Sequence, residues 1–518
     1  MWLKVHFVLM LMLTISTNNM TSSLKILGIF PHPGLSHFHF FHPIMRGLAD
    51  AGHDVTVVSH FPDKNAPQNY IDMPLTKTTL LTDSVNLEWF SHRPWYMHFQ
   101  EFFLLYQWGV DACELALNST VVKNILNKKS KYDVILLEQF NNDCMMAVAW
   151  KLKAPVIGLS SCVLMPWHYD RLGNPLIPSY VPGLFVGSSD KMDFLERLNN
   201  WFAVNGLKLM YQYITMSETE KIIQKHFKNE DIPPISELAK KTSLMFVNSH
   251  YSFSGSRPNA PTVVELGGVH IKEEKPLDPE IKALLDSSAD GVIYVSWGSM
   301  IRAETLPHEK RNELLKAFGA FEQKILWKWE NETLPDQPKN VYIRSWMPQR
   351  EILCHPNVLV FVSHGGLMGS SEAAYCGVPM VLTPMYGDQF QNSAAAVSRG
   401  MGFIVHYEHI TEEAFKTAIS NALTTEAMQS AKKVSYSYRN RLKNPLETAI
   451  WWVEYVAATR GAPLLKSHST DLSILAYYSF DIYIVIFFIL LVIITFYACI
   501  LRFTFKKIFV RVTKSKTD

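Results

Sequence analysis

The sequence predicts an α/β fold built from two doubly wound parallel sheets, followed by a single membrane-spanning helix. Short apolar runs alternate with helical patterns along most of the 518 residues, as in parallel sheets with helices on both faces. A stretch rich in proline, glycine and acidic residues, 258–288, separates two such series. An uninterrupted apolar run, 482–501, follows the second series. These three observations define the predicted order of the chain.

The first series begins with a predicted βαβ unit. An apolar run is followed by a helical segment that Gly52 ends, and a second apolar run then returns parallel to the first. The predicted elements of the first half are strands at 24–30, 54–59, 131–137 and 155–160, and helices at 36–51, at 142–152 and within 192–227.

The second series repeats this alternation after the linker. Its predicted elements are strands at 291–296, 324–329, 341–343, 358–362 and 378–383, and helices at 307–322, 393–400 and 412–422. Ligands of such sheets bind outside the carboxyl ends of the strands, so two sheets predict a site in the cleft between the halves. The predicted boundaries are a signal peptide at 1–23, a first domain at 24–265, a linker at 266–288, a second domain at 289–460, a transmembrane helix at 482–501 and a tail at 502–518.

The composition excludes several classes of protein. Charged residues make up 19% and hydrophobic residues 48%, which excludes a disordered or collagen-like chain. The net charge of +2 comes from the ends, because the last seventeen residues carry +5 and the first 23 carry +1, which leaves −4 for residues 24–501. Such a body lacks the basic face that nucleic acids require, so no nucleic acid is expected as a partner.

The six cysteines are too few to build a disulfide scaffold. Their spacing matches neither a disulfide framework nor a metal site. We expect buried thiols, and a disulfide in an oxidising compartment stays open as the alternative.

Both ends of the chain carry membrane signals. Lys4 precedes about ten apolar residues, which is typical of a secretory signal peptide and too short to span a bilayer. Residues 482–501 contain no charge and six basic residues follow them, which predicts a membrane helix with a cytoplasmic tail and a lumenal body. Lys514 and Lys516 resemble a dilysine retrieval signal, so we expect a single-pass type I protein of the endoplasmic reticulum membrane. Two sequons outside the signal region, Asn118-Ser-Thr and Asn331-Glu-Thr, offer glycosylation sites in that compartment.

The segment 346–391 carries the strongest functional signal. In it a buried strand ends in S-H-G-G, and a helix then opens with free backbone N–H groups that favour a phosphate. Glu372 is suited either to ribose hydroxyls or to the helix start, and Trp346 either to stacking on a base or to the core. Asp388 and Gln389, after the next strand, offer acceptors and donors suited to sugar hydroxyls.

Together these residues resemble the signature of the UDP-glycosyltransferase family. The spacing from His364 through Glu372 to Asp388-Gln389 is intact, and the resemblance covers nearly the whole chain. The stretch A-P-V-I-G-L-S-S-C-V-L-M-P-W-H-Y-D-R-L-G-N-P is similar to arthropod members. The resemblance implies the GT-B architecture, two facing Rossmann-like domains. It also implies transfer of a hexosyl group, with UDP-glucose favoured over UDP-glucuronate, to hydroxyl groups of small lipophilic acceptors, as in detoxification of xenobiotics and endogenous metabolites.

The same resemblance implies roles for single residues. Trp346 would stack on uracil and Gln349 would contact the nucleoside, while Ser299 and His364 would contact the diphosphate. The remaining assignments are Gly366 and Ser370 beside the diphosphate, Glu372 on the ribose, and Asp388 and Gln389 on the sugar. Met368 departs from the pattern, because vertebrate relatives often carry asparagine there, so one phosphate contact differs.

The predicted general base is His37, which matches the family's catalytic histidine. The reaction needs an acceptor hydroxyl made nucleophilic near neutral pH, and a histidine suits that task because its pKa lies close by. The segment P-H-P-G-L-S-H places it just after the first strand, at the start of a helix. A carboxylate behind the ring would orient it, and Glu138 stands at the position of the family's aspartate, with Asp143 as the alternative.

The expected mechanism is one in-line displacement that inverts the anomeric carbon. No metal or other cofactor is expected, because the histidines at 37, 39 and 42 do not share one helix face and the UDP-sugar is a co-substrate. Two alternatives are a catalytically silent, membrane-anchored binding protein and a transferase dedicated to one lipid or glycan. An aromatic stretch, 99–106, would either contact the acceptor or pack an amphipathic helix. The acceptor and the oligomeric state, a homo-oligomer included, stay open.

Overall fold

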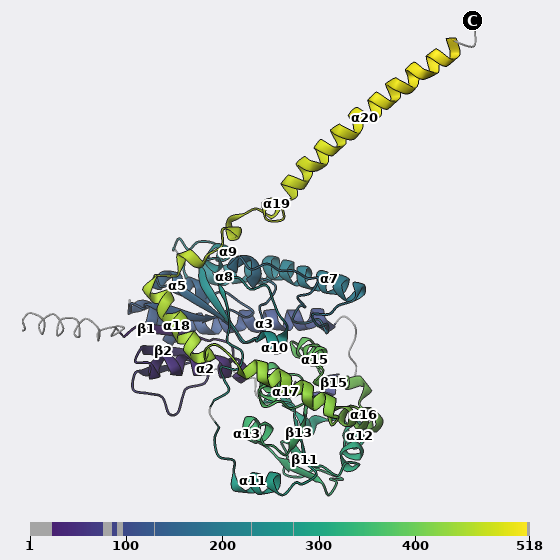
Figure 1. Ribbon diagram of the computed structural model, residues 1–518. Coiled ribbons are helices and arrows are strands. Elements are labelled where there is room, and N and C mark those ends of the chain that lie inside the picture. The colour runs from purple at the N-terminus through teal and green to yellow at the C-terminus, as the bar shows by residue number, and fades with distance from the viewer. Residues whose placement is uncertain are drawn as a thin grey trace, which may run out of the picture. The chain divides into compact units, whose positions relative to one another are not determined.

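A computed structural model of the chain describes residues 23–75, 85–90, 97–128, 130–228, 230–272 and 274–514. The chain forms two compact units, of which the first, called the body here, ends at Lys466. The body holds two parallel sheets, one among the purple to teal elements and one among the green elements of Figure 1. The predicted signal peptide lies outside the described residues, except for Ser23.

The first sheet has seven parallel strands in the order β3-β2-β1-β5-β6-β7-β8. They are β1 (Lys25–Ile29), β2 (Asp54–Ser59), β3 (Tyr70–Pro74), β5 (Val134–Glu138), β6 (Val156–Ser160), β7 (Thr242–Val247) and β8 (Val263–Glu265). The helices of this half are α2 (Leu35–Asp50), α3 (Met97–Asn118), α4 (Thr120–Asn127), α5 (Met145–Leu152), α6 (His168–Leu172), α7 (Phe194–Met210), α8 (Met216–His226), α9 (Ile235–Ala239) and α10 (Tyr251–Ser254). All four predicted strands are present. The strands β3, β7 and β8 were not predicted, and β8 lies inside the stretch rich in proline, glycine and acidic residues.

The second sheet has six parallel strands in the order β12-β11-β9-β13-β14-β15. They are β9 (Val292–Ser296), β11 (Lys324–Lys328), β12 (Val341–Arg344), β13 (Val358–Ser363), β14 (Met380–Leu382) and β15 (Gly402–Ile404). The helices around it are α11 (Pro279–Asp286), α12 (His308–Gly319), α13 (Gln349–Leu353), α14 (Leu367–Cys376), α15 (Gln389–Ser398), α16 (Glu412–Ala422) and α17 (Thr425–Arg439). The predicted fold class of two doubly wound sheets is confirmed.

Strand pairing brings distant loops together. Because β1 pairs in parallel with β5, from Ile26 opposite Val134 to Ile29 opposite Leu137, the segments that follow both strands leave the same edge side by side. In the second sheet β9 lies between β11 and β13, so the segments after these three strands also meet at one edge. Buried apolar runs such as β5, which is buried along its whole length, allow helices to cover both faces.

A short segment of the first half completes the core of the second. The strand β4 (Val85–Asn86) pairs with β10 (Ile301–Arg302), away from both large sheets. Leu87 and Phe90 lie in the same apolar cluster as strands of the second sheet. The backbone oxygen of Leu87 accepts a hydrogen bond of 2.8 Å from the hydroxyl of Tyr407.

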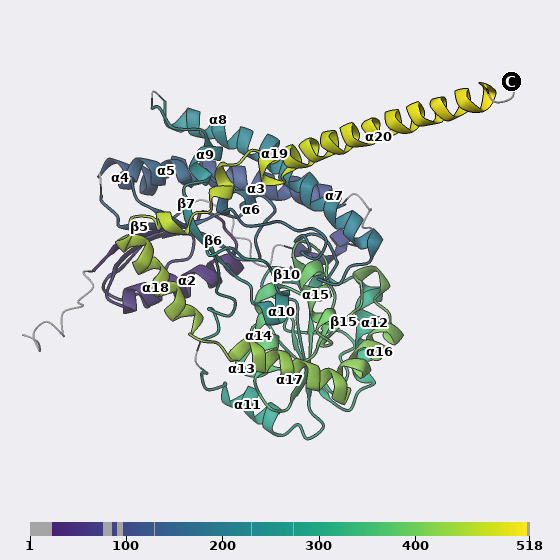
Figure 2. The ribbon, with the colours of Figure 1, turned by 45° about the horizontal axis from the view of Figure 1, so that its top comes forward.

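A helix from the end of the body follows the second sheet in the sequence but packs on the first half. The apolar side of α18 (Pro445–Ala458) contributes Ala449, Val453 and Val456 to the core of the first sheet, next to α2. Figure 2 shows α18 beside α2 on the first half. This helix belongs to the predicted second domain by sequence position, and the domain boundaries themselves stay a prediction.

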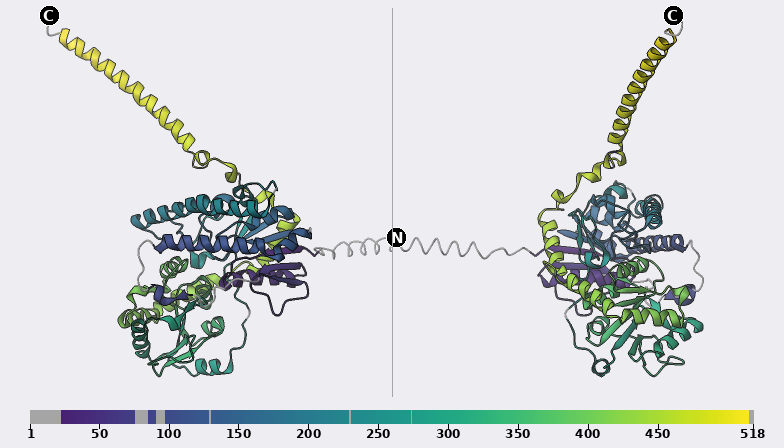
Figure 3. Two further views of the ribbon diagram at one scale, coloured as in Figure 1. Left: turned by 180° about the vertical axis from the view of Figure 1, so that it is seen from behind. Right: turned by 45° about the vertical axis from the view of Figure 1, so that its right-hand side comes forward.

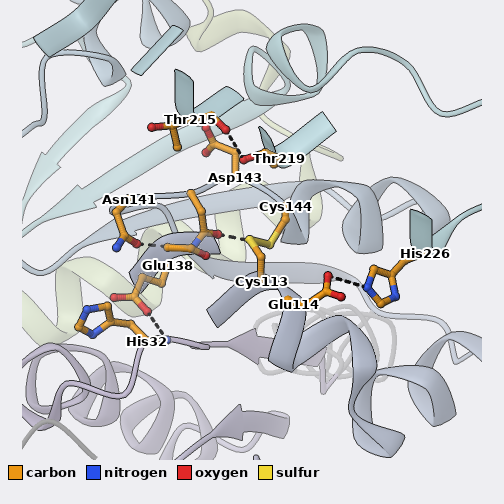
Figure 4. The surroundings of a disulfide bond; sticks show 12 residues. His32, Cys113, Glu114, Glu138, Asn141, Asp143, Cys144, Thr215, Thr219 and His226 are labelled. Carbon is orange, nitrogen blue, oxygen red and sulfur yellow. Dashed lines mark hydrogen bonds and ion pairs between the residues drawn. A yellow bond between two sulfur atoms is a disulfide. The ribbon is translucent and has the colours of Figure 1, made fainter. Parts of the chain in front are cut away.

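Four of the six cysteines form disulfide bonds, which corrects the expectation of buried thiols. The bonds join Cys113 to Cys144 and Cys354 to Cys376, with Cα–Cα distances of 6.0 and 4.8 Å. The partners are 31 and 22 residues apart, so the fold, not a spacing pattern, brings them together. Figure 4 shows the first bond beside Asp143, in the segment between β5 and α5. Cys162 is a buried thiol, as expected.

The second unit begins at Ser467 and contains α19 (Ile474–Tyr477) and α20 (Phe480–Lys514). Within the described ranges, α20 is the one helix that is long and apolar enough to cross a membrane, over Phe480–Phe509. It contains the predicted span 482–501 and is the yellow helix of Figure 3. Such a helix suggests membrane anchoring, while Lys516 lies outside the described residues.

The packing of α18 generates a stability prediction. Replacing the fully buried Val453 by alanine should lower the free energy of unfolding by about 2 kcal/mol, because two buried methyl groups are lost and a cavity remains. Urea unfolding of the detergent-solubilised protein, followed by circular dichroism, measures the change. Glu447→Gln in the same helix is the control, since that side chain is exposed, and an equal loss in both variants would contradict the packing described.

Candidate active site

A cavity of about 520 Å³ lies between the carboxyl edges of the two sheets. Most of the residues predicted for the site line it. They are His37, Ser299, Trp346, Gln349, His364, Gly366, Glu372, Asp388 and Gln389. Ser370 and Asp143 do not line the cavity, and Glu138 reaches it through its contact with His37.

His37 and Glu138 form a hydrogen-bonded pair at the edge of the first sheet. His37 lies in the first turn of α2, and Glu138 is the last residue of β5. The histidine Nδ1 is 2.7 Å from Oε1 of the buried carboxylate. With the proton on Nδ1, this contact leaves Nε2 as the basic nitrogen.

Burial sets the protonation of this pair. It lowers the pKa of His37, so the ring stays neutral at physiological pH and can accept a proton. It also raises the pKa of Glu138, while the charges of the neighbouring histidines and a hydrogen bond of 3.3 Å from the backbone N–H of His32 lower it. A neutral imidazole held from behind by a carboxyl group is the arrangement of a general base.

His32 stacks on His37 and restricts its orientation. The ring centroids are 4.2 Å apart with an angle of 9° between the planes, and the ring of Phe140 meets His37 edge-on at 4.6 Å. The ligand atoms of His32, His37 and Glu138 lie within 4.8 Å of one another. Because the two imidazole planes are nearly parallel, a cation in the plane of one ring would lie outside the plane of the other. The expected absence of a metal site remains a prediction.

Asp143, the alternative partner of His37, is engaged elsewhere. Its carboxylate oxygens each accept a hydrogen bond of 2.7 Å from the guanidinium of Arg171. One of them, Oδ2, also accepts a hydrogen bond of 2.6 Å from the hydroxyl of Tyr211. All three side chains are buried. The geometry therefore brings Glu138, and not Asp143, to the histidine.

At the opposite wall of the cavity, His364 follows β13 at the start of α14. A Cβ atom on Gly366 would lie 2.4 Å from Nε2 of His364, and one on Gly298 would lie 2.8 Å from its Cε1. Only glycine at both positions therefore leaves room for the ring between them. The N-terminal N–H groups of α14 open into the same region, next to Ser299, which makes it suited to an anion.

Gln349 and Glu372 form a second polar pair on neighbouring helices. The amide nitrogen of Gln349, the first residue of α13, donates a hydrogen bond of 2.6 Å to Oε2 of Glu372 in α14. The disulfide between Cys354 and Cys376 joins the ends of these two helices. Trp346, just before α13, is 65% exposed, so its indole face is open for stacking.

Asp388 and Gln389 lie at the start of α15, after the loop that follows β14. Burial raises the pKa of Asp388 to about 6, and Oδ2 accepts a hydrogen bond of 2.8 Å from the amide of Asn392. The side-chain oxygen Oε1 of Gln389 accepts hydrogen bonds from the backbone N–H groups of Met385 and Tyr386, which fixes the side chain. Both residues line the cavity.

The first half supplies an apolar wall. Leu105 and Trp108 of α3, Phe140, and the pair Leu184 and Phe185 line this end of the cavity. The aromatic stretch singled out in the sequence belongs to the same helix, but its described aromatic side chains, Phe102, Phe103 and Tyr106, do not line the cavity. This wall is suited to a lipophilic ligand.

Lys328 is a cavity residue that the sequence analysis missed. It is the last residue of β11, its side chain is buried, and its ammonium is 2.7 Å from a carboxylate oxygen of Glu330. Burial, together with the charge of Lys328, lowers the pKa of His364 to about 4. The rule that ligands bind beyond the carboxyl ends of parallel strands would have pointed to it.

The family described as UDP-glucoronosyl and UDP-glucosyl transferase matches residues 30–516. The chain belongs to this family. It is a UDP-glycosyltransferase, a hexosyltransferase that uses a UDP-sugar as donor.

Two relatives and one solved structure agree with this assignment. The chain is 36% identical over 479 residues to "UDP-glycosyltransferase UGT5" of Dactylopius coccus, covering 90% of each chain. It is 33% identical to "UDP-glucosyltransferase 2" of the same organism, covering 88% of each. The structure of UDP-glucose: anthocyanidin 3-O-glucosyltransferase in complex with UDP has a TM-score of 0.55 at 16% identity, covering 84% of this chain and 99% of that chain. This likeness supports the GT-B fold of the UDP-glycosyltransferase.

The half-buried carboxyl of Glu372 generates a prediction of pH-dependent nucleoside binding. Burial raises the pKa of Glu372 to about 7, and only the ionised carboxylate accepts hydrogen bonds from ribose hydroxyls with both oxygens. The affinity for uridine should therefore fall as the pH drops from roughly 8 to roughly 6. Calorimetric titration with uridine, which has no phosphate of its own to titrate, measures this change. Glu372→Gln should bind more weakly and without this pH dependence; a wild-type affinity that rises on acidification would contradict the assignment.

Proposed function

We propose that this enzyme transfers a hexosyl group, glucose in the first place, from a UDP-sugar to hydroxyl groups of small lipophilic acceptors. The observation that carries the proposal is the His37–Glu138 pair, which shares one cavity with Asp388, Gln389 and His364. A proton acceptor and the residues expected to hold the donor thus lie on facing walls of the same space.

His37 acts as the general base. Its Nε2 takes the proton of the acceptor hydroxyl while that oxygen forms a bond to the anomeric carbon. The bond between this carbon and the β-phosphate oxygen breaks, its electron pair leaves with UDP, and the configuration inverts. Glu138 holds Nδ1–H and stabilises the imidazolium, whose charge would otherwise be costly in a buried site.

The second half stabilises the leaving group. Ser299, His364 and the N-terminal N–H groups of α14 line the wall where the diphosphate is expected. Lys328 adds a positive charge on the same side. Donors and charges that are already in place stabilise the charge that develops on UDP without reorganising.

Two groups of residues in the second half hold the nucleoside and the sugar. Trp346 stacks on uracil, and Gln349 and Glu372 hold the nucleoside. Asp388 and Gln389 hold the sugar hydroxyls. Glucose is proposed because a relative that is 33% identical is named a UDP-glucosyltransferase, and the lipophilic acceptor because the facing wall is apolar.

The enzyme is proposed to be a type I protein of the endoplasmic reticulum membrane. The residues after the apolar run, 502–518, are basic, as expected for a cytoplasmic segment. The body carries two disulfides, which persist in oxidising compartments. Asn118 and Asn331 of the sequons are both exposed.

Substitutions at the dyad test the chemistry. His37→Ala and Glu138→Gln should each lower kcat by about 10²–10⁴-fold with UDP-glucose and a panel of phenols, because the acceptor loses its base or the base loses its orientation. Release of UDP and formation of the conjugate are measured together. The affinity for UDP, measured by calorimetry, should not change.

Asp143→Asn serves as the contrasting variant. It leaves Arg171 buried beside a neutral partner, so it should lower the thermal unfolding temperature more than Glu138→Gln does. Equal turnover by wild type and His37→Ala would exclude His37 as the base. Turnover with UDP-glucuronate alone would exclude glucose as the sugar.

Glycosylation tests the topology. In microsomes, Asn118→Gln and Asn331→Gln should each remove one endoglycosidase-sensitive step in electrophoretic mobility, because both sites would face the lumen. The body should resist added protease until detergent opens the vesicles. An unglycosylated body that is cleaved in intact vesicles would reverse the proposed orientation.

A further inference from the structure

The loop that joins α6 to α7, residues 173–193, forms part of the apolar wall of the cavity. Leu184 and Phe185 of this loop line the cavity, and both also belong to a buried apolar cluster. The backbone hydrogen bonds of the loop include tight turns, such as that from the N–H of Val181 to the carbonyl of Ile177, at 3.0 Å. Such turns shape the loop only locally, so its contacts with other elements determine where the two side chains lie.

Asn200 of α7 holds the first part of this loop. Its side chain is fully buried, and its Oδ1 accepts a hydrogen bond of 2.8 Å from the backbone N–H of Gly183. Its Nδ2 donates hydrogen bonds to the carbonyls of Pro178, at 2.7 Å, and Val181, at 2.9 Å. One amide thus pairs three backbone groups of the loop, which would be costly to bury without partners. The last of these groups directly precedes Leu184.

Asp190 ties the end of the loop to the second half. Its Oδ1 accepts a hydrogen bond of 3.1 Å from the hydroxyl of Ser398, and its Oδ2 accepts one of 3.0 Å from the guanidinium of Arg399, at the end of α15. The loop also passes the first turn of this helix, because a Cβ atom on Gly187 would lie 3.7 Å from that of Phe390. Figures 1 and 2 both show α15 below α7. Each half therefore holds one end of the loop.

We propose that this loop selects the acceptor, and that Asn200 and Asp190 are positioning residues that hold Leu184 and Phe185 in place for it. The acceptor occupies the apolar end of the cavity in the proposed function, on which this inference rests. An apolar pocket recognises a lipophilic molecule by contact area, so the size of the acceptor that fits depends on where the ring of Phe185 lies.

The attachment to α15 also relates the acceptor to the donor. This helix begins with Asp388 and Gln389, which are proposed to hold the sugar, and ends at the ion pair with Asp190. One helix therefore fixes both the sugar contacts and the loop that faces the acceptor. Transfer requires the acceptor oxygen to lie close to the anomeric carbon, and a shared support keeps the two contact surfaces in register.

Kinetics of the full-length, detergent-solubilised protein with UDP-glucose and two acceptors, phenol and naphthol, test the proposal. Asn200→Ala should raise the KM of both acceptors about 10-fold, because the loop must then be ordered on binding. It should also shift the ratio of kcat/KM towards naphthol, because the ring of Phe185 can give way to the larger acceptor. Asp190→Asn, at a partly exposed ion pair, should act in the same direction by a smaller factor. The affinity for UDP, measured by calorimetry, should not change in either variant.

A combination of substitutions separates positioning from mere stabilisation. Phe185→Ala should shift the ratio of kcat/KM towards naphthol by about 10-fold, because it leaves room for a second ring. In the Phe185→Ala background, Asn200→Ala should change this ratio much less than in the wild type, since the loop then has no ring to position. A residue that only stabilised the fold would have the same effect in both backgrounds.

Asn340→Ala is the matched control. The amide of Asn340 also holds a loop, by hydrogen bonds of 2.9–3.1 Å to three carbonyls of the second half, but this residue does not line the cavity. Its loss should lower the thermal unfolding temperature and leave the acceptor ratio at the wild-type value.

An unchanged acceptor ratio in Phe185→Ala, or an equal effect of Asn200→Ala in both backgrounds, would overturn the proposal. Phe185→Ala and Asp190→Asn give the same readout should Asn200→Ala not fold, and an unchanged ratio in both would overturn it as well. A wild-type protein that binds UDP but conjugates neither acceptor would instead refute the proposed function.

Discussion

Parallel pairing of the strands is the constraint on which the site depends. All carboxyl ends of a parallel sheet lie at one edge, so parallel pairing alone brings the short segments that follow separate strands close together. In the first sheet this edge brings His37 to Glu138, which are 101 residues apart in the chain. In the second sheet it brings the segments after β9, β11 and β13 together, with Ser299, Lys328 and His364. The cavity is the space where the two edges face each other.

Much of this arrangement could be predicted from the sequence because it follows from local patterns. Buried parallel strands are short apolar runs, and most of them stand out between helical segments. Most of the donor wall was found because its residues, apart from Ser299, lie within one stretch of fewer than fifty positions. The features that were missed depend on contacts between distant segments. The disulfides and the strand β8 have no local pattern that distinguishes them. Lys328 is distinguished only by its place at the carboxyl end of a predicted strand.

The choice between Glu138 and Asp143 shows where sequence reasoning ends. Both are acidic residues that follow the same predicted strand, 131–137, and either suits a histidine at the neighbouring strand end. The difference comes from Arg171, which lies 28 residues after Asp143 and binds both of its oxygens. Only the folded chain shows that one carboxylate already has a guanidinium partner, which leaves the other for the imidazole. A buried charge without such a partner would be costly, so loss of either member of this ion pair is expected to destabilise the first half.

The two halves have exchanged segments, and this decides what can be separated. Residues 85–90 of the first half complete the core of the second, and α18 completes the core of the first. A cut in the linker would therefore give two fragments, each of which lacks one piece of its interior and exposes the apolar surface that the missing piece covers. We therefore expect the body to fold as one unit despite its two sheets. Transplanting one half onto a homologue to alter acceptor choice requires that both exchanged segments move with the half whose core they fill.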